Sequence, residues 1–84
     1  MPFIVYILYS NKLDKYYTGY CTDISSRVNK HNFGSTPSTK PGIPWKLVYY
    51  EEFSTKTDAI KRELEIKKKK SRKYIEYLIS NFSG

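Results

Sequence analysis

The sequence predicts a small α+β domain that begins with an antiparallel β-hairpin. An apolar run rich in β-branched residues, 3–9, is followed after a short polar stretch by a second strand pattern at 16–21. A third strand pattern begins after a long loop, and the remaining segments have helical periodicity with capping residues. The 84 residues are enough for a single domain, which we place at 1–84.

The register of the hairpin decides where its tyrosines point. Turn formers between the two strands favour a four-residue loop with Ser10 opposite Lys15. This register puts Tyr6 opposite Gly19 and brings Tyr6 and Tyr17 to one face as diagonal neighbours, because side chains alternate along a strand. A glycine opposite Tyr6 leaves space for a phenol or a substrate backbone. The alternative is that both tyrosines are ordinary aromatic strand residues.

A first helix is predicted directly after the hairpin. Thr22 and Asp23 offer oxygens that can cap its start, and Gly34 ends it. Arg27 and His31 lie four residues apart at the edge of the apolar stripe that must pack on the sheet. They point inward or along the sheet surface, unless they are a snorkelling arginine and a partly exposed histidine.

A loop and a third strand come next. The segment 33–44 is rich in Gly, Ser, Thr and Pro, with Lys40 near its middle, and loops of this length are often functional. The third strand is predicted over 45–53. Strict alternation places Trp45 and Tyr49 on the same face of this strand.

A second helix, predicted from about Thr57 to Lys70, has a charged residue on the side that faces the core. Glu63 lies on the stripe that faces the core. Burial of an unpaired carboxylate is costly, so Glu63 must meet a cation. The candidates are Lys67 one helical turn further on, Arg27 from the first helix, or a metal ion.

The charge balance points to a polyanionic partner. Fifteen Lys and Arg against eight Asp and Glu give a formal net charge of +7. Nucleic acid is the first candidate, an anionic membrane surface the second, and an acidic protein partner a further alternative.

The basic residues are concentrated before and at the start of a last helix capped by Ser71. The tract consists of Lys67, Lys68, Lys69, Lys70, Arg72 and Lys73. Lysines at a helix end are often just solvated, but the overall charge favours nucleic-acid contact here, with Lys40 as an additional contact.

Several other classes of protein are disfavoured. No apolar stretch is long enough to span a membrane, and the N-terminal run lacks the features of a signal peptide, so we expect a cytoplasmic protein. One cysteine, Cys21, and one histidine are too few for a zinc site. Cys21 is expected to be a buried thiol at the end of a strand.

Short motifs follow one another in order along nearly the whole chain: Ile4-Val5-Tyr6, Tyr17-Thr18-Gly19, the Arg27-to-His31 helix, Pro44-Trp45-Lys46-Leu47-Val48-Tyr49, Ala59-Ile60-Lys61-Arg62-Glu63 and Ile66-Lys67. In this order they resemble the GIY-YIG nuclease superfamily, specifically its small stand-alone bacterial members, which are related to the N-terminal nuclease domain of the excinuclease ABC repair enzyme. The chain departs from the family pattern in two places. Ile4 stands where the first motif has glycine, and Asn81 is the only late candidate for an asparagine found in larger members.

The resemblance implies a fold, a reaction and a set of site residues. The fold would be a three-stranded antiparallel sheet flanked by about three helices, and the reaction a divalent-metal-dependent cleavage of phosphodiester bonds in DNA, possible repair substrates included. Tyr6 would be the general base and Tyr17 its partner that positions water or phosphate. Arg27 and His31 would contact the phosphate, and Glu63 would bind Mg²⁺ or Mn²⁺. A non-catalytic, basic nucleic-acid-binding module with the same fold is the alternative.

Overall fold

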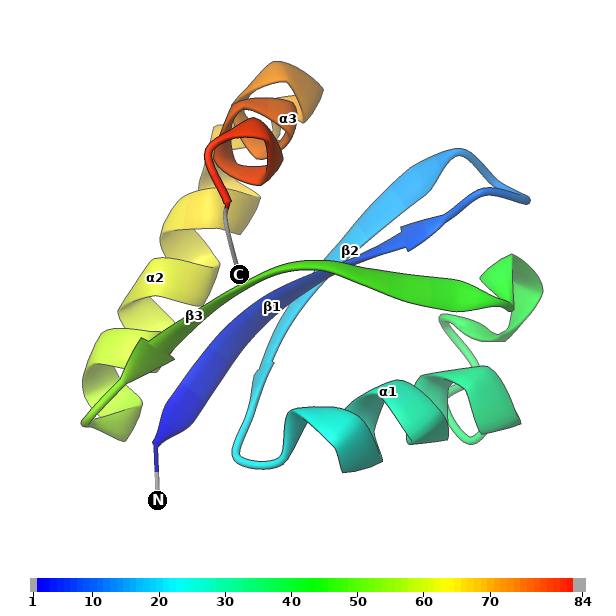
Figure 1. Cartoon of the computed structure of the whole chain (residues 1–84), viewed down its shortest axis with the longest axis horizontal. Helices are drawn as coiled ribbons and strands as arrows, with labels where there is room; N and C mark the ends of the chain where they lie inside the picture. The colour runs from blue at the N-terminus through cyan, green and yellow to red at the C-terminus, as the bar shows by residue number, and fades with distance from the viewer. Residues whose placement is uncertain (1, 83–84) are drawn as a thin grey trace.

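Three strands form one antiparallel sheet, and the apolar run near the N-terminus is its central strand. A computed structural model describes residues 2–82. β1 (Phe3–Ser10) pairs with β2 (Lys15–Cys21) on one side and with β3 (Trp45–Phe53) on the other, in the order β2-β1-β3 (Figure 1). The predicted α+β class with a three-stranded antiparallel sheet is confirmed. Because β1 is central, β2 is an edge strand with a free side.

The register of the hairpin is the predicted one. Tyr6 lies opposite Gly19, and Ser10 lies opposite Lys15. Tyr17 lies opposite Leu8, two residues from Tyr6 along β1, and both tyrosines belong to the same apolar cluster. The prediction that Tyr6 and Tyr17 share one face is therefore confirmed.

Each helix begins and ends for a local reason. The Asp23 side chain accepts a hydrogen bond from the Ser26 amide at the start of α1 (Ile24–Phe33), and Gly34 ends the helix with φ of 85°. α2 (Lys56–Lys69) and α3 (Arg72–Ser80) are capped by the side chains of Thr55 and Ser71. Within 2–82, no helix is long and apolar enough to cross a membrane.

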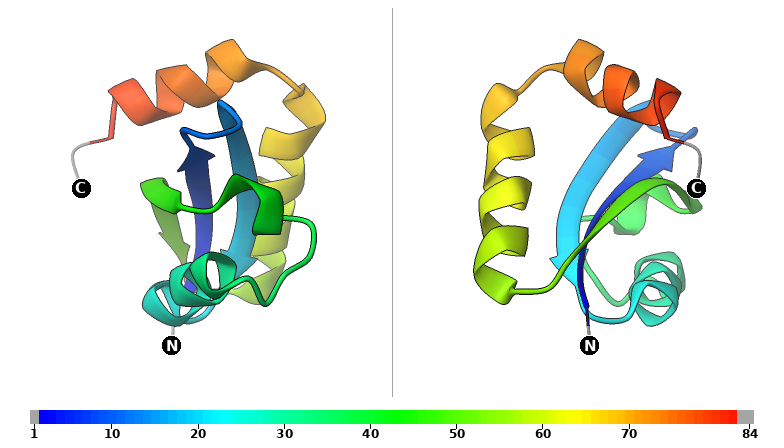
Figure 2. Two further views of the ribbon diagram at one scale, coloured as in Figure 1. Left: turned by 90° about the vertical axis from the view of Figure 1, so that its right-hand side faces the viewer. Right: turned by 60° about the vertical axis from the view of Figure 1, so that its left-hand side comes forward.

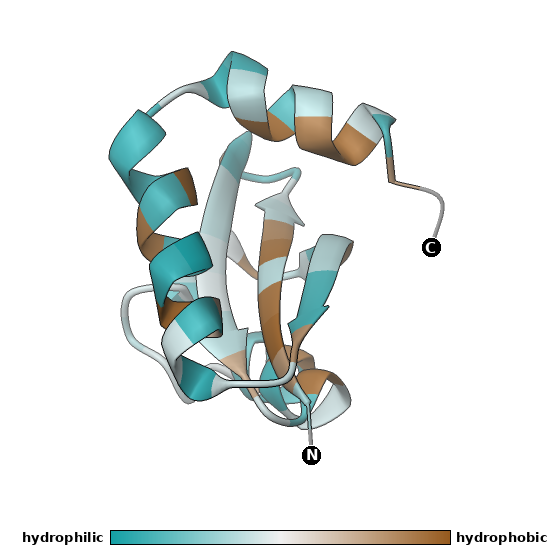
Figure 3. Cartoon of the chain, turned by 90° about the vertical axis from the view of Figure 1, so that its left-hand side faces the viewer, coloured by the Kyte–Doolittle hydropathy of each residue, from teal (hydrophilic) through white to brown (hydrophobic). Residues whose placement is uncertain are grey.

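The helices cover the two faces of the sheet unequally. α1 packs on one face, where Tyr6 of β1 meets Val28, while α2 and α3 pack on the other, where Val5 meets Ile66 and Leu78. Figure 2 shows α1 and α2 on opposite sides of the sheet. In Figure 3 β1 is the most hydrophobic strand, and α2 and α3 turn hydrophobic residues toward it. Their polar sides face solvent, as amphipathic helices require.

The predicted alternation of β3 is wrong beyond its middle. The pairing of β1 with β3 steps from Ile7 opposite Tyr49 to Leu8 opposite Leu47, so Val48 is an extra residue in a β-bulge. Trp45 consequently lies in the cluster on the α1 face, whereas Tyr49 lies in the cluster on the other face. A bulge shifts the period of two by one residue, which alternation alone cannot foresee.

The segment between α1 and β3 is held down by side chains from three elements. It contains a 3₁₀ turn, Lys40–Gly42. The Asn32 side chain accepts from the Trp45 amide at 2.6 Å and donates to the Trp45 carbonyl at 3.0 Å. The Trp45 indole N–H donates to the Thr39 carbonyl at 2.6 Å, and the Ser10 hydroxyl donates to the Gly42 carbonyl at 2.7 Å. These hydrogen bonds fix the predicted loop against the face of the sheet that α1 covers.

Candidate active site

Tyr6 is enclosed by its neighbours, and Gly19 makes the room for it. The Tyr6 side chain has no exposed area. A Cβ added to Gly19 would lie 2.6 Å from the Tyr6 hydroxyl oxygen and 2.8 Å from Cζ, closer than real Cβ contacts. The phenol therefore occupies the space that the sequence predicted opposite this glycine.

His31 connects the Tyr6 hydroxyl to the loop after α1. His31 Nε2 lies 3.0 Å from the Tyr6 hydroxyl, and Nδ1 lies 2.8 Å from Thr39 Oγ1. The Thr39 hydroxyl in turn donates to the Thr36 carbonyl at 3.3 Å. Since a carbonyl only accepts, Thr39 accepts from Nδ1–H, and Nε2 is left to accept from Tyr6. His31 is 2% exposed, so the alternative of a partly exposed histidine is wrong.

The surroundings keep this pair neutral. Burial raises the pKa of Tyr6, Tyr17 adds to the increase, and the charge of Arg27 opposes it. Burial lowers the pKa of His31, and Arg27 lowers it further. A nearby cation favours the phenolate, and Arg27 acts on Tyr6 in that direction, but burial outweighs it. The result is a neutral phenol that donates to a neutral imidazole.

Tyr17 connects the buried pair to the surface. Its ring centroid lies 6.4 Å from that of Tyr6 and 5.0 Å from that of His31, with a third aromatic contact to Trp45 at 6.3 Å. Tyr17 is only partly buried and lines an open groove beside β2. Of the two motif tyrosines, it is therefore the one that borders an open groove.

Arg27 lies beside Tyr6 at the far end of β2. Its charge acts on the pKa of Tyr6, His31 and Cys21, which places the guanidinium among these groups. Arg27 also lines a shallow hollow of about 330 Å³ together with Cys21 and Lys56. Cys21 is the last residue of β2 and is buried, as predicted.

Glu63 belongs to α2, which packs on the other side of the sheet from α1. Its side chain is 14% exposed, and Oε2 accepts from Lys67 Nζ at 3.1 Å, which is the helix ion pair foreseen among the alternatives. On α2, Glu63 lies between Lys56, which lines the hollow of Arg27, and Lys67, which lines the groove of Tyr17. Because α2 packs on the face opposite to Tyr6 and Tyr17, Glu63 does not join them on one face of the sheet.

A metal ion at this edge would depend on Glu63. Among residues 2–82 there is no group of three or more His, Cys, Asp or Glu side chains that could hold a metal ion by themselves. A single carboxylate suits Mg²⁺, which keeps several waters and shares its coordination with substrate phosphate. The donor set therefore fits a hard divalent ion that arrives with substrate, and does not fit a permanent structural metal.

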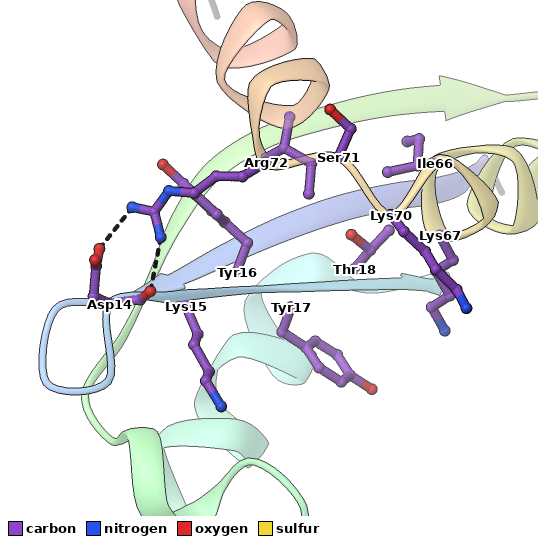
Figure 4. A pocket seen from close by; sticks show the side chains of 11 residues that line it. Asp14, Lys15, Tyr16, Tyr17, Thr18, Ile66, Lys67, Lys70, Ser71 and Arg72 are labelled. Carbon is purple, nitrogen blue, oxygen red and sulfur yellow. Dashed lines mark hydrogen bonds and ion pairs between the residues drawn. The ribbon is translucent and has the colours of Figure 1, made fainter.

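The basic tract divides into residues with different surroundings. Lys67 and Lys70 line the groove of Tyr17, together with Lys15 of β2 (Figure 4). Arg72 also lines the groove, but its guanidinium donates to the Asp14 carboxylate at 2.7 Å and pairs with Glu76 at 3.2 Å. Three further members of the tract do not line this groove: Lys69, whose Nζ lies 4.9 Å from the centre of the Tyr74 ring, and the exposed Lys68 and Lys73. Lys40 is exposed in the 3₁₀ turn.

Sequence reasoning missed part of the site. Thr39, which orients His31, is one of several hydroxyl residues in a polar loop, and no spacing distinguishes it. Sequence reasoning placed Lys15 opposite Ser10 in the hairpin and did not single out Lys56. Lys15 is the first residue of β2, and Lys56 lies near Cys21 at the other end because α2 packs along that strand, which only the fold shows.

Comparison with known proteins decides the family. The model of the GIY-YIG catalytic domain matches residues 2–75. The chain belongs to the GIY-YIG family. Domains of this family are nuclease domains and generally depend on a divalent metal ion. The recognition made from the motifs is confirmed, including the match to small stand-alone members.

The similar proteins are themselves small GIY-YIG chains. A UPF0213 protein of Staphylococcus epidermidis is 48% identical over 64 residues, 75% of this chain and 77% of that protein. One of Staphylococcus aureus is 52% identical over 52 residues, 61% of this chain and 63% of that protein. The solution NMR structure of a UPF0213 protein from Bacillus halodurans has a TM-score of 0.62 and 38% identity, and covers 100% of this chain and 88% of that one.

Proposed function

We propose that this GIY-YIG protein is a metal-dependent endonuclease that cleaves phosphodiester bonds in DNA at the free edge of β2. The observation that carries the proposal is the hydrogen-bonded chain from Tyr6 through His31 to Thr39. Binding to nucleic acid alone does not require a buried phenol that donates a hydrogen bond to a neutral imidazole. A hydrolytic site does, because the attacking water must lose a proton.

The groups divide into those that meet substrate and those behind them. Tyr17 borders the groove and positions the phosphate or the attacking water. Arg27, at the other end of β2, offers its charge to the phosphate oxygens. The water oxygen bonds to phosphorus as the bond to the leaving oxygen breaks, and the leaving oxygen takes up a proton from solvent water. The proton that the water gives up is taken by Tyr6, whose own hydroxyl proton passes to His31 Nε2, 3.0 Å away.

The burial of Tyr6 sets a condition on this scheme. Tyr6 has no exposed area, and Tyr17 and Arg27 are among the groups beside it. A phosphate that attracts Arg27 away from the phenol opens a path to it. His31 and Thr39 act through Tyr6 and are positioning residues.

Glu63 is the residue that would hold the divalent ion. When bound there, Mg²⁺ or Mn²⁺ would offset negative charge on the phosphate oxygens. Lys67 occupies one oxygen of Glu63, so an ion must compete with its ammonium group or displace it. The Lys67 side chain is 49% exposed, so displacing its ammonium group from Glu63 costs little free energy.

The experiment that tests the proposal is a cleavage assay on single-stranded, nicked and branched DNA, with Mg²⁺ or Mn²⁺ and with a chelator. The wild-type protein should cut with metal only, and Tyr17→Phe should lose most of that activity. Tyr50→Phe is the matched control, since Tyr50 lies on β3 opposite Tyr6 and belongs to the same apolar cluster. Equal rates for the two variants would remove Tyr17 from the reaction.

The second candidate is a nucleic-acid-binding module without activity. The ion pair between Glu63 and Lys67 favours it, because a carboxylate satisfied within its own helix needs no metal. This alternative predicts DNA binding that is unchanged by metal, together with no cleavage of any of the three DNA forms.

A further inference from the structure

The groove beside Tyr17 has the charge and shape of a phosphate-binding surface. It is open, has a volume of about 440 Å³, and runs between β2 and the α2–α3 connection. In Figure 4 the Lys15 side chain and the Tyr17 hydroxyl point toward the same side as Lys67 and Lys70, around an apolar floor that includes Ile66. Lysines are flexible point charges, which suit phosphates and carry no base code.

The groove is closed at one end by an ion pair that is already complete. Arg72 donates to the carboxylate of Asp14 at 2.7 Å and to its backbone carbonyl at 2.9 Å. The Arg72 guanidinium also lies 5.2 Å from the centre of the Tyr16 ring. With its donors used in this way, Arg72 is part of the wall and not a phosphate ligand, in contrast to its predicted role.

A second cationic hollow lies at the opposite end of the same strand. Arg27 and Lys56 line it beside Cys21, the last residue of β2. β2 therefore has cations at both ends, Lys15 with Lys70 at one and Arg27 with Lys56 at the other, and Tyr17 lies along the strand between them. Two sites of like charge on either side of a reaction centre are arranged for one extended polyanion.

We propose that the free edge of β2 is the track of one nucleic-acid strand, with Lys15 and Lys70 on phosphates at one side of the cleaved bond and Lys56 with Arg27 at the other. This inference rests on the proposed function. It adds Lys15 and Lys56 to the binding surface and leaves out Lys68, Lys69, Arg72 and Lys73. Since the track contacts phosphates, it predicts binding that depends little on base sequence.

The length of the strand sets the size of the bound segment. β2 has 7 residues, which at about 3.3 Å per residue span roughly 20 Å. A duplex strand rises about 3.4 Å per nucleotide, so this edge matches about six nucleotides. Shorter oligonucleotides should bind progressively more weakly, and longer ones should gain little per added nucleotide.

The test measures binding of a labelled DNA duplex as salt is raised, with a chelator present so that no cleavage occurs. The track variants are Lys15→Gln, Lys56→Gln and Lys70→Asn, the last because residue 70 has φ of 46° and asparagine tolerates that conformation. The control variants are Lys46→Gln on the other edge strand and Lys61→Gln on α2, which are exposed and lose the same charge.

Each track variant should reduce the slope of log affinity against log salt by about 0.9, the value for one lost phosphate contact. The controls should keep the wild-type slope. Equal effects in track and control variants would overturn the track, because they would indicate diffuse attraction. If the track variants bind like wild type while wild type still cuts DNA, the track is wrong and the nuclease stands. If the track variants reduce the slope as expected but the wild-type protein never cuts DNA, the proposed nuclease activity is wrong and the binding track stands.

Discussion

At the scale of single residues, the position of the Tyr6 phenol depends on Gly19, which has no side chain. Gly19 lets the Tyr6 phenol lie against the β2 backbone, from which it reaches His31. The second family motif thus has a physical reason for its glycine: any larger residue would push the phenol away. By contrast, Ile4 replaces the glycine of the first motif, and it packs in the core at 7% exposure.

Gly19→Ala should therefore destabilise the fold by about 1 to 3 kcal/mol, the usual cost of overpacking a core. The new Cβ would lie 2.6 Å from the Tyr6 hydroxyl, so the phenol must move off His31. Urea unfolding measures the cost. In a Tyr6→Leu background the same substitution should cost clearly less, and an equal cost in both backgrounds would refute the contact.

His31 allows a clean test by pH, because it is the only histidine in the chain. Burial lowers its pKa below the unfolded value of about 6.5, so the unfolded state binds the proton more readily. Stability should be fully present above pH 6.5 or so and should fall as pH drops through that value, by at most about 1.4 kcal/mol per pH unit. Thermal melts between about pH 5 and pH 7 measure this. His31→Gln should remove the dependence, and a variant with the wild-type slope would contradict it.

At the scale of elements, the local signals in the sequence predicted most of the fold. Caps at Asp23 and Ser71 and the glycine after α1 are short-range chemistry, and the structure has each of them. The bulge at Val48 and the orienting contact from Thr39 were not predictable, since both depend on which segments pack together. The predicted basic tract was also divided by tertiary contacts, with Arg72 turned to Asp14.

A polar network joins three of these elements and was not foreseen either. Arg62 of α2 donates to Glu51 of β3 at 3.0 Å and to the Tyr74 hydroxyl of α3 at 2.9 Å, and it also pairs with Glu65. The Tyr49 hydroxyl donates to the same Glu51 oxygen. Burial and this hydrogen bond raise the pKa of Tyr49 to about 12. The family motif around Ala59 to Glu63 thus includes a residue that fastens α2 to its neighbours.

Arg62→Met should lower the free energy of unfolding by about 1 to 3 kcal/mol, because Glu51 and Tyr74 lose a partner in a partly buried place. The Arg62 side chain is 19% exposed, whereas that of Arg72 is 48% exposed. Arg72→Met should therefore cost clearly less than Arg62→Met, because solvent weakens an exposed ion pair. Denaturant unfolding of both variants measures the difference, and a larger loss in Arg72→Met would contradict the assignment.

At the scale of the whole molecule, the candidate site residues are distributed over both faces of the sheet. The α1 face supplies Tyr6, Tyr17, Arg27 and His31, and the other face supplies Glu63 from α2. In the proposed mechanism they act together along β2, the edge strand with α2 beside it. The proposal thus assigns both the reaction centre and the binding surface of this 84-residue chain, with its charge of +7, to one edge of the sheet.

The most direct test of this account compares metal-dependent cleavage, DNA binding and thermal melting on one preparation of Glu63→Gln. Glutamine keeps the shape and hydrogen bonding of glutamate but cannot replace its charge at a metal ion. We predict a folded protein that binds DNA at least as well as wild type and no longer cuts it. A stable Glu63→Gln protein that cuts at the wild-type rate would contradict the account and leave the binding module in its place.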